Sequence, residues 1–335
     1  MKRGAAFLVF AGIFLFFTLN TVFAQQTIQV RLASPVPRNS DWGRTLDRMA
    51  AEWASVTNNQ VRLRVIHDGI EGSESKSFSS LATNNIQASL FTSFGLSLIC
   101  PQIMTLSVPF MIRDEAELDA VLKDVLPELE KKVNADYVVV AWSKVGWANV
   151  FSKDPIFEPN DLRKHKLATS PETKELNTAF KTMGFNLVET GLTDVGPRLA
   201  NNMINAVYQT PASVAPLRLY KTLGNMLDLP IAPIMGGIVV NRVTWNKLSA
   251  NHQREILRVT RKIVEEFDAA MPVTVANAVS MMQKDGLKLN KPDSRQEALW
   301  YAEAQRALPA LLGTTFDREI YQRINDRLEK TRNRQ

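Results

Sequence analysis

Apolar and polar residues alternate along several short segments of the chain, and this period of two predicts β-strands. Apolar side chains occupy every second position over residues 27–32 and 61–66, so each segment offers one face to a core and one to water. Residues 88–92 and 137–142 are nearly continuous apolar runs, which is typical of strands buried on both faces. Residues 236–241 predict a further strand after a loop that contains prolines.

A period near 3.6 predicts helices between these strands. Leu46, Met49 and Trp53 recur at helical spacing after a capping Ser40 or Asp41. Further helical patterns cover residues 78–85, 115–133, 172–183, 197–204, 251–270, 271–285, 295–312 and 317–330, and we expect interruptions at Pro127 and Pro272. The βαβ order at the start of the chain predicts an α/β fold with a mostly parallel, helix-covered sheet.

The chain has the length of two ordinary domains or of one bilobed unit, with 335 residues. It contains no internal repeat and no low-complexity linker. We therefore expect two lobes joined by crossing strands and a shared helix. A cleft between such lobes is a usual place for a ligand.

The N-terminus has the pattern of an export signal. Lys2 and Arg3 precede an apolar run over residues 7–17, and small residues at 22 and 24 predict cleavage before Gln25. Residues 1–24 are thus interpreted as a signal peptide, and the alternative is an uncleaved membrane anchor. Cys100 is the single cysteine, so no internal disulfide can form, which suits a bacterial periplasm.

Charge and candidate chemistry exclude several classes of function. The net charge of +6 is mild and the basic residues are interleaved with acids, which argues against nucleic-acid binding. His67, His165 and His252 are scattered and are expected in loops or on the surface, so we predict no metal site. The sequence contains no Gly-x-Ser-x-Gly motif for a hydrolase, and we expect no enzyme activity and no cofactor.

Four segments resemble motifs of one family in the correct order: residues 40–43, 81–88, 106–111 and 240–248. The family is that of the periplasmic binding subunits of TRAP transporters, the DctP type. The resemblance implies two α/β lobes joined by hinge strands and a long shared helix. It also implies a binding protein, not an enzyme, that closes on a small molecule and delivers it to integral-membrane permease subunits.

The resemblance sets approximate lobe boundaries. Lobe I is expected to comprise residues 25–150 plus about 235–280, and lobe II residues 151–234 plus about 281–335. Some members of the family associate with periplasmic tetratricopeptide-repeat proteins, so such a protein is a further candidate partner. A sensor or scaffold protein that does not take part in transport is the remaining alternative.

The departures from the family pattern concern the ligand. The family commonly has an arginine that clamps a carboxylate where this chain has Ala168, and a second frequent arginine where it has Ala148. An asparagine that often contacts the carboxylate corresponds to Gln209. Loss of one partner of a buried ion pair costs roughly 3–5 kcal/mol, or on the order of a hundred- to several-thousand-fold in affinity.

We therefore predict a cleft for an apolar or uncharged molecule. The candidate ligand-binding residues are Trp42, Thr92, Ser93, Phe94, Trp147, Ala148, Phe151, Ala168, Thr169, Tyr208, Gln209 and Met235. Several have plain structural alternatives, because the tryptophans can be core residues and Thr92 and Ser93 can bond a strand end. A carboxylate-binding receptor with a relocated cation, Arg38 or Lys144, stays open as the alternative.

Overall fold

The computed structural model describes residues 27–191 and 194–333, and the proposed signal peptide lies outside them. The helices are α1 (Asp41–Val56), α2 (Glu74–Ala82), α3 (Ser93–Ser97), η1 (Pro101–Ser107), α4 (Glu115–Lys132), α5 (Pro159–Arg163), α6 (Lys174–Thr182), α7 (Val195–Ala200), α8 (Pro211–Val214), α9 (Tyr220–Leu223), α10 (Arg242–Trp245), α11 (Ala250–Lys284), α12 (Ser294–Leu311) and α13 (Arg318–Arg332). None of these helices combines the length and apolar character that a membrane crossing requires.

The strands are β1 (Ile28–Ala33), β2 (Val61–Ile66), β3 (Ala88–Thr92), β4 (Tyr137–Ser152), β5 (Leu167–Thr169), β6 (Leu187–Glu189), β7 (Ala206–Gln209), β8 (Asn225–Leu227), β9 (Ala232–Asn241) and β10 (Lys288–Asn290). The main path through the described sheet is β2-β1-β3-β9-β4-β7-β5-β6, and β8 joins β4 and β10. The α/β fold class is therefore confirmed.

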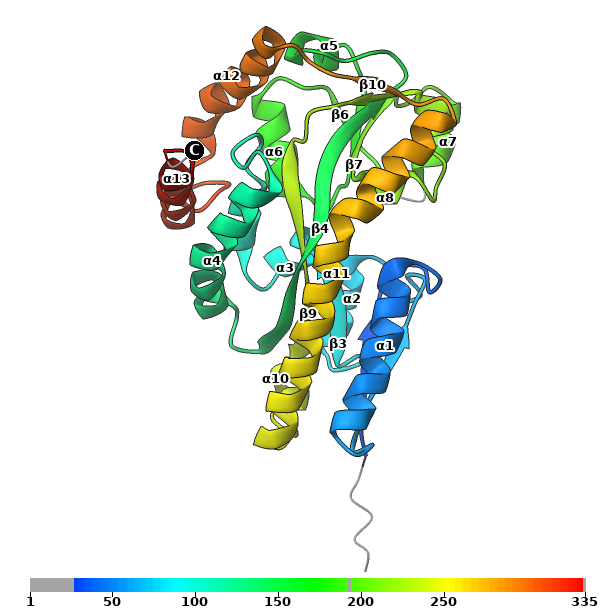
Figure 1. The fold of residues 1–335 in the computed structure, drawn as a ribbon, viewed down its shortest axis with the longest axis vertical. Coiled ribbons are helices and arrows are strands. Elements are labelled where there is room, and N and C mark those ends of the chain that lie inside the picture. The colour runs from blue at the N-terminus through cyan, green and yellow to red at the C-terminus, as the bar shows by residue number, and fades with distance from the viewer. Residues whose placement is uncertain (1–26, 192–193, 334–335) are drawn as a thin grey trace, which may run out of the picture.

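Two strands connect the two ends of the molecule. β4 pairs with β9 from Tyr137 to Ala148 and continues as the partner of β7 and β8 up to Ser152. The pairing of β4 with β9 shifts register at two places, between Val139 and Ala141 and between Lys144 and Gly146. Figure 1 shows α11 running along the same axis beside β4 and β9. Crossing strands and a shared long helix are thus present, as the sequence predicts.

Three apolar clusters form the core. The first is the largest and joins residues from both halves of the chain, from Phe91 and Met104 to Leu176 and Tyr208. The second lies between α1, the first strands and α11. The third lies between β4, β7 and the region of α7 to α9. Because the first cluster is continuous across the centre of the molecule, the two ends share one packed interior in this structure.

The sheet is mixed, which corrects the expectation of a mostly parallel sheet. β1, β2 and β3 are parallel, and so are β5, β6 and β7. β9 and β4 run antiparallel to each other and to the strands on either side of them. The initial βαβ order describes one end of the sheet, but the two crossing strands enter from distant parts of the sequence and reverse direction.

The expected helix interruptions at two prolines are also wrong. Both Pro127 and Pro272 lie inside continuous helices, α4 and α11. A proline removes one hydrogen bond from a helix, but buried side chains on both sides hold these helices in place. Val125 and Leu129 flank Pro127 in the core, and Met271 directly precedes Pro272 there.

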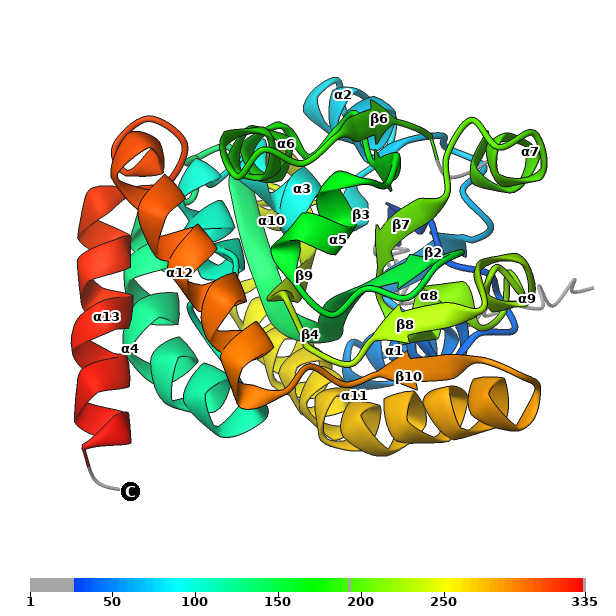
Figure 2. The same cartoon turned by 90° about the horizontal axis from the view of Figure 1, so that it is seen from above.

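The C-terminal helices pack against different parts of the molecule. α12 contacts α5 and α6, whereas α13 contacts α4 and η1. Figure 2 shows α13 running beside α4. The segment assigned to the end of lobe II therefore reaches back to elements assigned to lobe I.

Candidate functional site

Adjacent strands bring together most of the candidate residues that follow Gly146. β4 and β7 pair Asn149 with Gln209, Val150 with Tyr208 and Phe151 with Val207. β5 lies beside β7 and places Ala168 next to Val207. Candidates that are up to 61 positions apart in sequence, from Ala148 to Gln209, therefore meet on three neighbouring strands.

The alternation of side chains separates these candidates onto two faces of the sheet. Ala148 and Tyr208 belong to the large cluster that includes Leu167, Leu176 and Phe180. Phe151 and Ala168 point to the other side and pack in the third cluster. Ala148 and Ala168, where the family resemblance predicts arginines, are thus buried on opposite faces, with 1% and 4% of their surface exposed.

Three of the candidates at the end of β3 and on β9 make hydrogen bonds that hold the fold. Ser93 Oγ donates to the carbonyl of Met235 at 3.2 Å and accepts from the Met235 amide at 2.9 Å. Thr92 Oγ1 caps α3 by accepting from the Phe94 amide at 3.4 Å. These groups tie α3 to β9, which agrees with the structural alternative stated for Thr92 and Ser93.

The two candidate tryptophans also have partners within the protein. Trp147 is half-buried and its indole Nε1 donates to Glu115 Oε2 at 3.1 Å. Trp42 stacks on Phe267 with ring centroids 4.2 Å apart, in the cluster between α1 and α11. The structure therefore does not bring Trp42 together with Tyr208 and Ala148.

None of the twelve candidate residues is exposed in this structure. Thr92, Phe94, Trp147 and Gln209 are half-buried, and the other eight are buried. Two hollows stand out among the described residues. One, of about 110 Å³, lies between the loop at residues 109–113, α12 and α13, and the other, of about 310 Å³, lies between α1 and α11. The candidate residues line packed interior, so a ligand can reach them only if the surrounding elements move apart.

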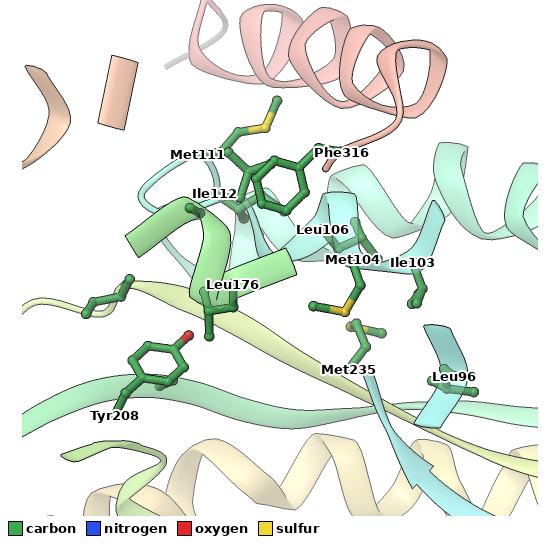
Figure 3. Close-up of a cluster of buried hydrophobic side chains, with 14 of the residues drawn as sticks. Leu96, Ile103, Met104, Leu106, Met111, Ile112, Leu176, Tyr208, Met235 and Phe316 are labelled. Carbon is green, nitrogen blue, oxygen red and sulfur yellow. The ribbon is translucent and has the colours of Figure 1, made fainter. Parts of the chain in front are cut away.

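Two of the buried candidates carry hydroxyl groups without a partner. Thr169 Oγ1 and the Tyr208 hydroxyl are buried atoms with no hydrogen bond in the described structure. Figure 3 shows the Tyr208 hydroxyl pointing toward Leu176, with Met104 and Met235 across the same apolar interior. Burial strongly raises the pKa of Tyr208, so this hydroxyl is neutral.

Two half-buried carboxylates, Glu74 and Asp268, were not foreseen from the sequence. Glu74 accepts from the Thr92 amide at 3.1 Å and the Gly95 amide at 2.8 Å. Burial, with a smaller contribution from the nearby Glu172, raises the pKa of Glu74 to about 7. Asp268 on α11 accepts from Ser143 Oγ at 2.5 Å, and burial raises the pKa of Asp268 to about 6. Isolated acids next to apolar residues give no sequence pattern, because their partners are backbone groups of distant segments.

Both cations considered for a relocated anchor are engaged elsewhere. Arg38 is an exposed side chain that pairs with Asp47 at 3.2 Å. Lys144 forms ion pairs with Glu115 and with Asp119 of α4. Over residues 27–191 and 194–333, the buried polar and charged side chains include no lysine and no arginine. The described interior therefore offers a ligand no fully buried cation.

The remaining single residues fit structural roles. Cys100 is buried, as expected for a small apolar residue. His67 and His165 lie in loops, as expected, and they are buried there, where one ring nitrogen of His67 bonds Asp47 and one of His165 bonds the carbonyl of Asp161. In the part of the chain that the structure describes, no group of three acidic, histidine or cysteine residues is placed to hold a metal ion.

A family model decides the class of the protein. The model for the bacterial extracellular solute-binding protein family 7, DctP, matches residues 32–312. The chain belongs to this family. Members of the TRAP group within it bind small molecules outside the cytoplasm and work with membrane permease subunits.

Curated relatives of the DctP chain are distant. A solute-binding protein from Verminephrobacter eiseniae is 22% identical over 273 residues, which is 80% of each chain. The 2,3-diketo-L-gulonate-binding periplasmic protein of Escherichia coli is 24% identical over 210 residues, 60% of this chain and 62% of that protein. These relatives are solute-binding receptors.

Solved structures of TRAP periplasmic binding proteins share the fold of this DctP chain. A protein from Xanthobacter autotrophicus with bound β-D-galacturonate superposes with a TM-score of 0.80 at 18% identity, covering 90% of this chain and 99% of that one. A Bordetella pertussis receptor that binds pyroglutamic acid superposes with a TM-score of 0.80 at 13% identity, covering 90% and 100%. The two-lobed architecture is thereby shown.

Proposed function

We propose that this chain is the periplasmic receptor of a TRAP-type transporter and that it captures an uncharged, largely apolar molecule between its lobes. The observation that carries the proposal is the absence of any buried lysine or arginine among the described residues. The burial of Ala148 and Ala168, where the family resemblance places arginines, also supports the proposal. A carboxylate taken out of water needs a paired, hydrogen-bonded cation.

The proposed lobes are residues 25–150 with about 235–280, and residues 151–234 with about 281–335. The register shifts in β4 support a hinge between them. Gly146 lies in the second register shift and has a φ of 123°. Residues other than glycine rarely adopt this backbone conformation. Separation of the lobes about this point would open the buried candidate residues to solvent, and closure would exclude water again.

The proposal also covers the export of the protein and its binding partners. Residues 1–24 direct export to the periplasm, and the loaded receptor docks on integral-membrane permease subunits. A tetratricopeptide-repeat protein is a further proposed partner, on the strength of the family resemblance alone. The candidate ligand-binding residues are the twelve named above, with Ala148 and Ala168 setting the specificity.

One observation favours a second candidate, a receptor for a carboxylate. The solved relatives from Xanthobacter autotrophicus and Bordetella pertussis bind galacturonate and pyroglutamic acid. A carboxylate here would have to draw a half-buried cation such as Lys144 away from Glu115 and Asp119. The energetic cost of breaking those ion pairs makes this candidate the weaker one.

A thermal-shift titration distinguishes the two candidates. The purified protein is heated with D-glucuronate, D-galacturonate and pyroglutamate, and in parallel with a neutral lipid extract of bacterial membranes. Binding to the folded state raises the midpoint by an amount that grows with the logarithm of the ligand excess over its dissociation constant. We expect a rise with the extract and none with the acids. A rise with any of the three acids at millimolar concentration would refute the uncharged-ligand proposal.

A further inference from the structure

The two residues that carry unpaired hydroxyls, Thr169 and Tyr208, occupy neighbouring positions on the same face of the sheet. β5 and β7 pair Leu167 with Ala206 and Ala168 with Val207, so the next step of this parallel register places Thr169 beside Tyr208. Leu167, Ala206 and Tyr208 all belong to the large central cluster. By the alternation of side chains, Thr169 shares this face.

Both side chains are more than nine-tenths buried, with 3% of Thr169 and 8% of Tyr208 exposed. The unpaired atom is in each case the only polar atom of the side chain. The buried histidines differ, because His67 and His165 each leave one ring nitrogen unpaired but bond through the other. A buried hydroxyl without any partner is costly for the fold, and native proteins usually satisfy such groups.

The surroundings of the Tyr208 hydroxyl are apolar. Tyr208 makes an edge-to-face contact with Phe180, with ring centroids 5.2 Å apart. Leu176 of α6 lies on the side to which the hydroxyl points, and Met104 and Met235 lie across the interior (Figure 3). A hydrogen-bond partner for the hydroxyls of Thr169 and Tyr208 must therefore come from outside this cluster.

We propose that Thr169 and Tyr208 form the polar anchor of the ligand site, and that the ligand carries one neutral hydrogen-bond acceptor at the end of an apolar body. A carbonyl, ether or hydroxyl oxygen would accept from both hydroxyls, while the apolar body packs against Leu176, Phe180 and Met235. This inference rests on the proposed function and narrows it, since it fixes the orientation of the ligand and the chemistry of its polar end.

Neutral donors select a neutral acceptor in this position. The Tyr208 hydroxyl stays protonated because burial raises its pKa, so it donates a hydrogen bond but supplies no charge. Two hydroxyl donors without a cation leave a carboxylate uncompensated. A pure hydrocarbon leaves both hydroxyls unpaired, so it should bind less tightly than a molecule of the same size with one carbonyl.

Three probes of similar size test this order: ethylbenzene, acetophenone and benzoate. They are titrated by calorimetry into the full chain and into Tyr208→Phe and Thr169→Val, which keep the shape of each side chain. We expect acetophenone to bind wild type best and to lose about five- to tenfold in each variant. Ethylbenzene should bind all three proteins within twofold of one another.

The stability of the unliganded protein gives a second readout. Tyr220→Phe is the matched control, because the Tyr220 hydroxyl is buried and bonded to Asp285 Oδ2 at 2.7 Å. Its unfolding midpoint should fall. The midpoints of Tyr208→Phe and Thr169→Val should stay level or rise, since each removes an unpaired buried hydroxyl.

The outcomes separate this inference from the proposed function. Equal binding of ethylbenzene and acetophenone, with no effect of the variants, overturns the anchor but leaves an uncharged ligand standing. Tightest binding of benzoate overturns both. A drop in midpoint for Tyr208→Phe as large as for Tyr220→Phe shows that the hydroxyl is satisfied within the fold, by an internal water for example, and overturns the anchor. Failure of wild type to bind acetophenone at millimolar concentration also counts against it.

Discussion

Two regions of the molecule treat buried carboxylates in opposite ways. Where α4 packs on α13, Glu117 is 5% exposed and bonds Arg332 through both its oxygens, at 2.7 and 2.9 Å. Burial opposes ionisation of Glu117, but the hydrogen bonds from Arg332 and the Arg113 amide outweigh it and lower the pKa of Glu117. Here the chain supplies an arginine to an anion in a way that matches bidentate recognition.

We define the central region as Glu74 and Asp268 with their partners at Thr92, Gly95 and Ser143. In this region no arginine donates hydrogen bonds to a carboxylate. The two carboxylates accept only from backbone amides and a serine hydroxyl. Burial raises their pKa values to about 7 and about 6. The chain therefore holds the Glu117 carboxylate with an arginine, whereas Glu74 and Asp268 are held without one.

The largest expected effect comes from placing an arginine in the third apolar cluster, at Ala168. Ala168→Arg puts a guanidinium into an apolar cluster with Phe151 and Val207. We expect it to lower the unfolding free energy by about 3–5 kcal/mol, the cost of an uncompensated buried charge. Urea denaturation measures this change.

Ala168→Met is the matched control for size alone, and overpacking should cost about 1–3 kcal/mol. If the two variants are equally stable, the arginine finds water or an acid, and Ala168 does not face a closed apolar interior. If D-glucuronate restores stability to Ala168→Arg but not to Ala168→Met, the position lines the ligand site.

The next largest effect concerns the α4–α13 pair. Arg332→Ala leaves the buried Glu117 without its partner, and we expect a loss of about 2–3 kcal/mol of unfolding free energy at pH 7, less than for a fully enclosed pair because Arg332 is partly exposed. The pKa of Glu117 is lowered on folding, so its contribution is present above the unfolded pKa and lost as pH falls through the folded pKa.

Arg323→Ala is the control for this prediction. Arg323 is an exposed arginine on the same helix, with pairs at 3.5 and 3.9 Å to Glu319 and Glu128. Its removal should change the unfolding free energy by less than about 0.5 kcal/mol. Equal losses for the two variants would show that Glu117 is not stabilised by its arginine.

The smallest effect should appear as a pH dependence at Glu74. Its pKa is raised from 4.5 to about 7 on folding, so the folded state binds the proton more tightly and stability falls as pH rises between these values. Glu74→Gln keeps an oxygen that can accept from Thr92 and Gly95 but cannot ionise. Between pH 5 and pH 7.5 we expect wild type to lose about 1–2 kcal/mol more than the variant. Parallel slopes in chemical denaturation would contradict the raised pKa.

Much of the fold could be predicted because long, periodic segments determine it. The strand at residues 61–66 and the helices that contain Leu46 and Leu118 are where the pattern predicts them. The three-residue strands β5, β6, β8 and β10 are too short to show a period, and only their neighbours in the sheet define them. The prediction of helix breaks at Pro127 and Pro272 is wrong because tertiary packing overrides the local preference of proline.

The candidate site could be predicted only in part. The family resemblance places arginines at Ala148 and Ala168, and both residues are buried, on strands β4 and β5 that the sequence pattern did not predict at these positions. Their separation onto opposite faces follows from strand register, which depends on distant pairings. The pairing state of Thr169 and Tyr208 likewise depends on what surrounds each hydroxyl in three dimensions.

The mass and charge of the molecule carried by the protein test the central claim most directly. Native mass spectrometry of protein purified from cells that express it, followed by solvent extraction, gives both. The account predicts an uncharged molecule with an apolar body. An organic acid, released in stoichiometric amount from the purified receptor, would contradict it.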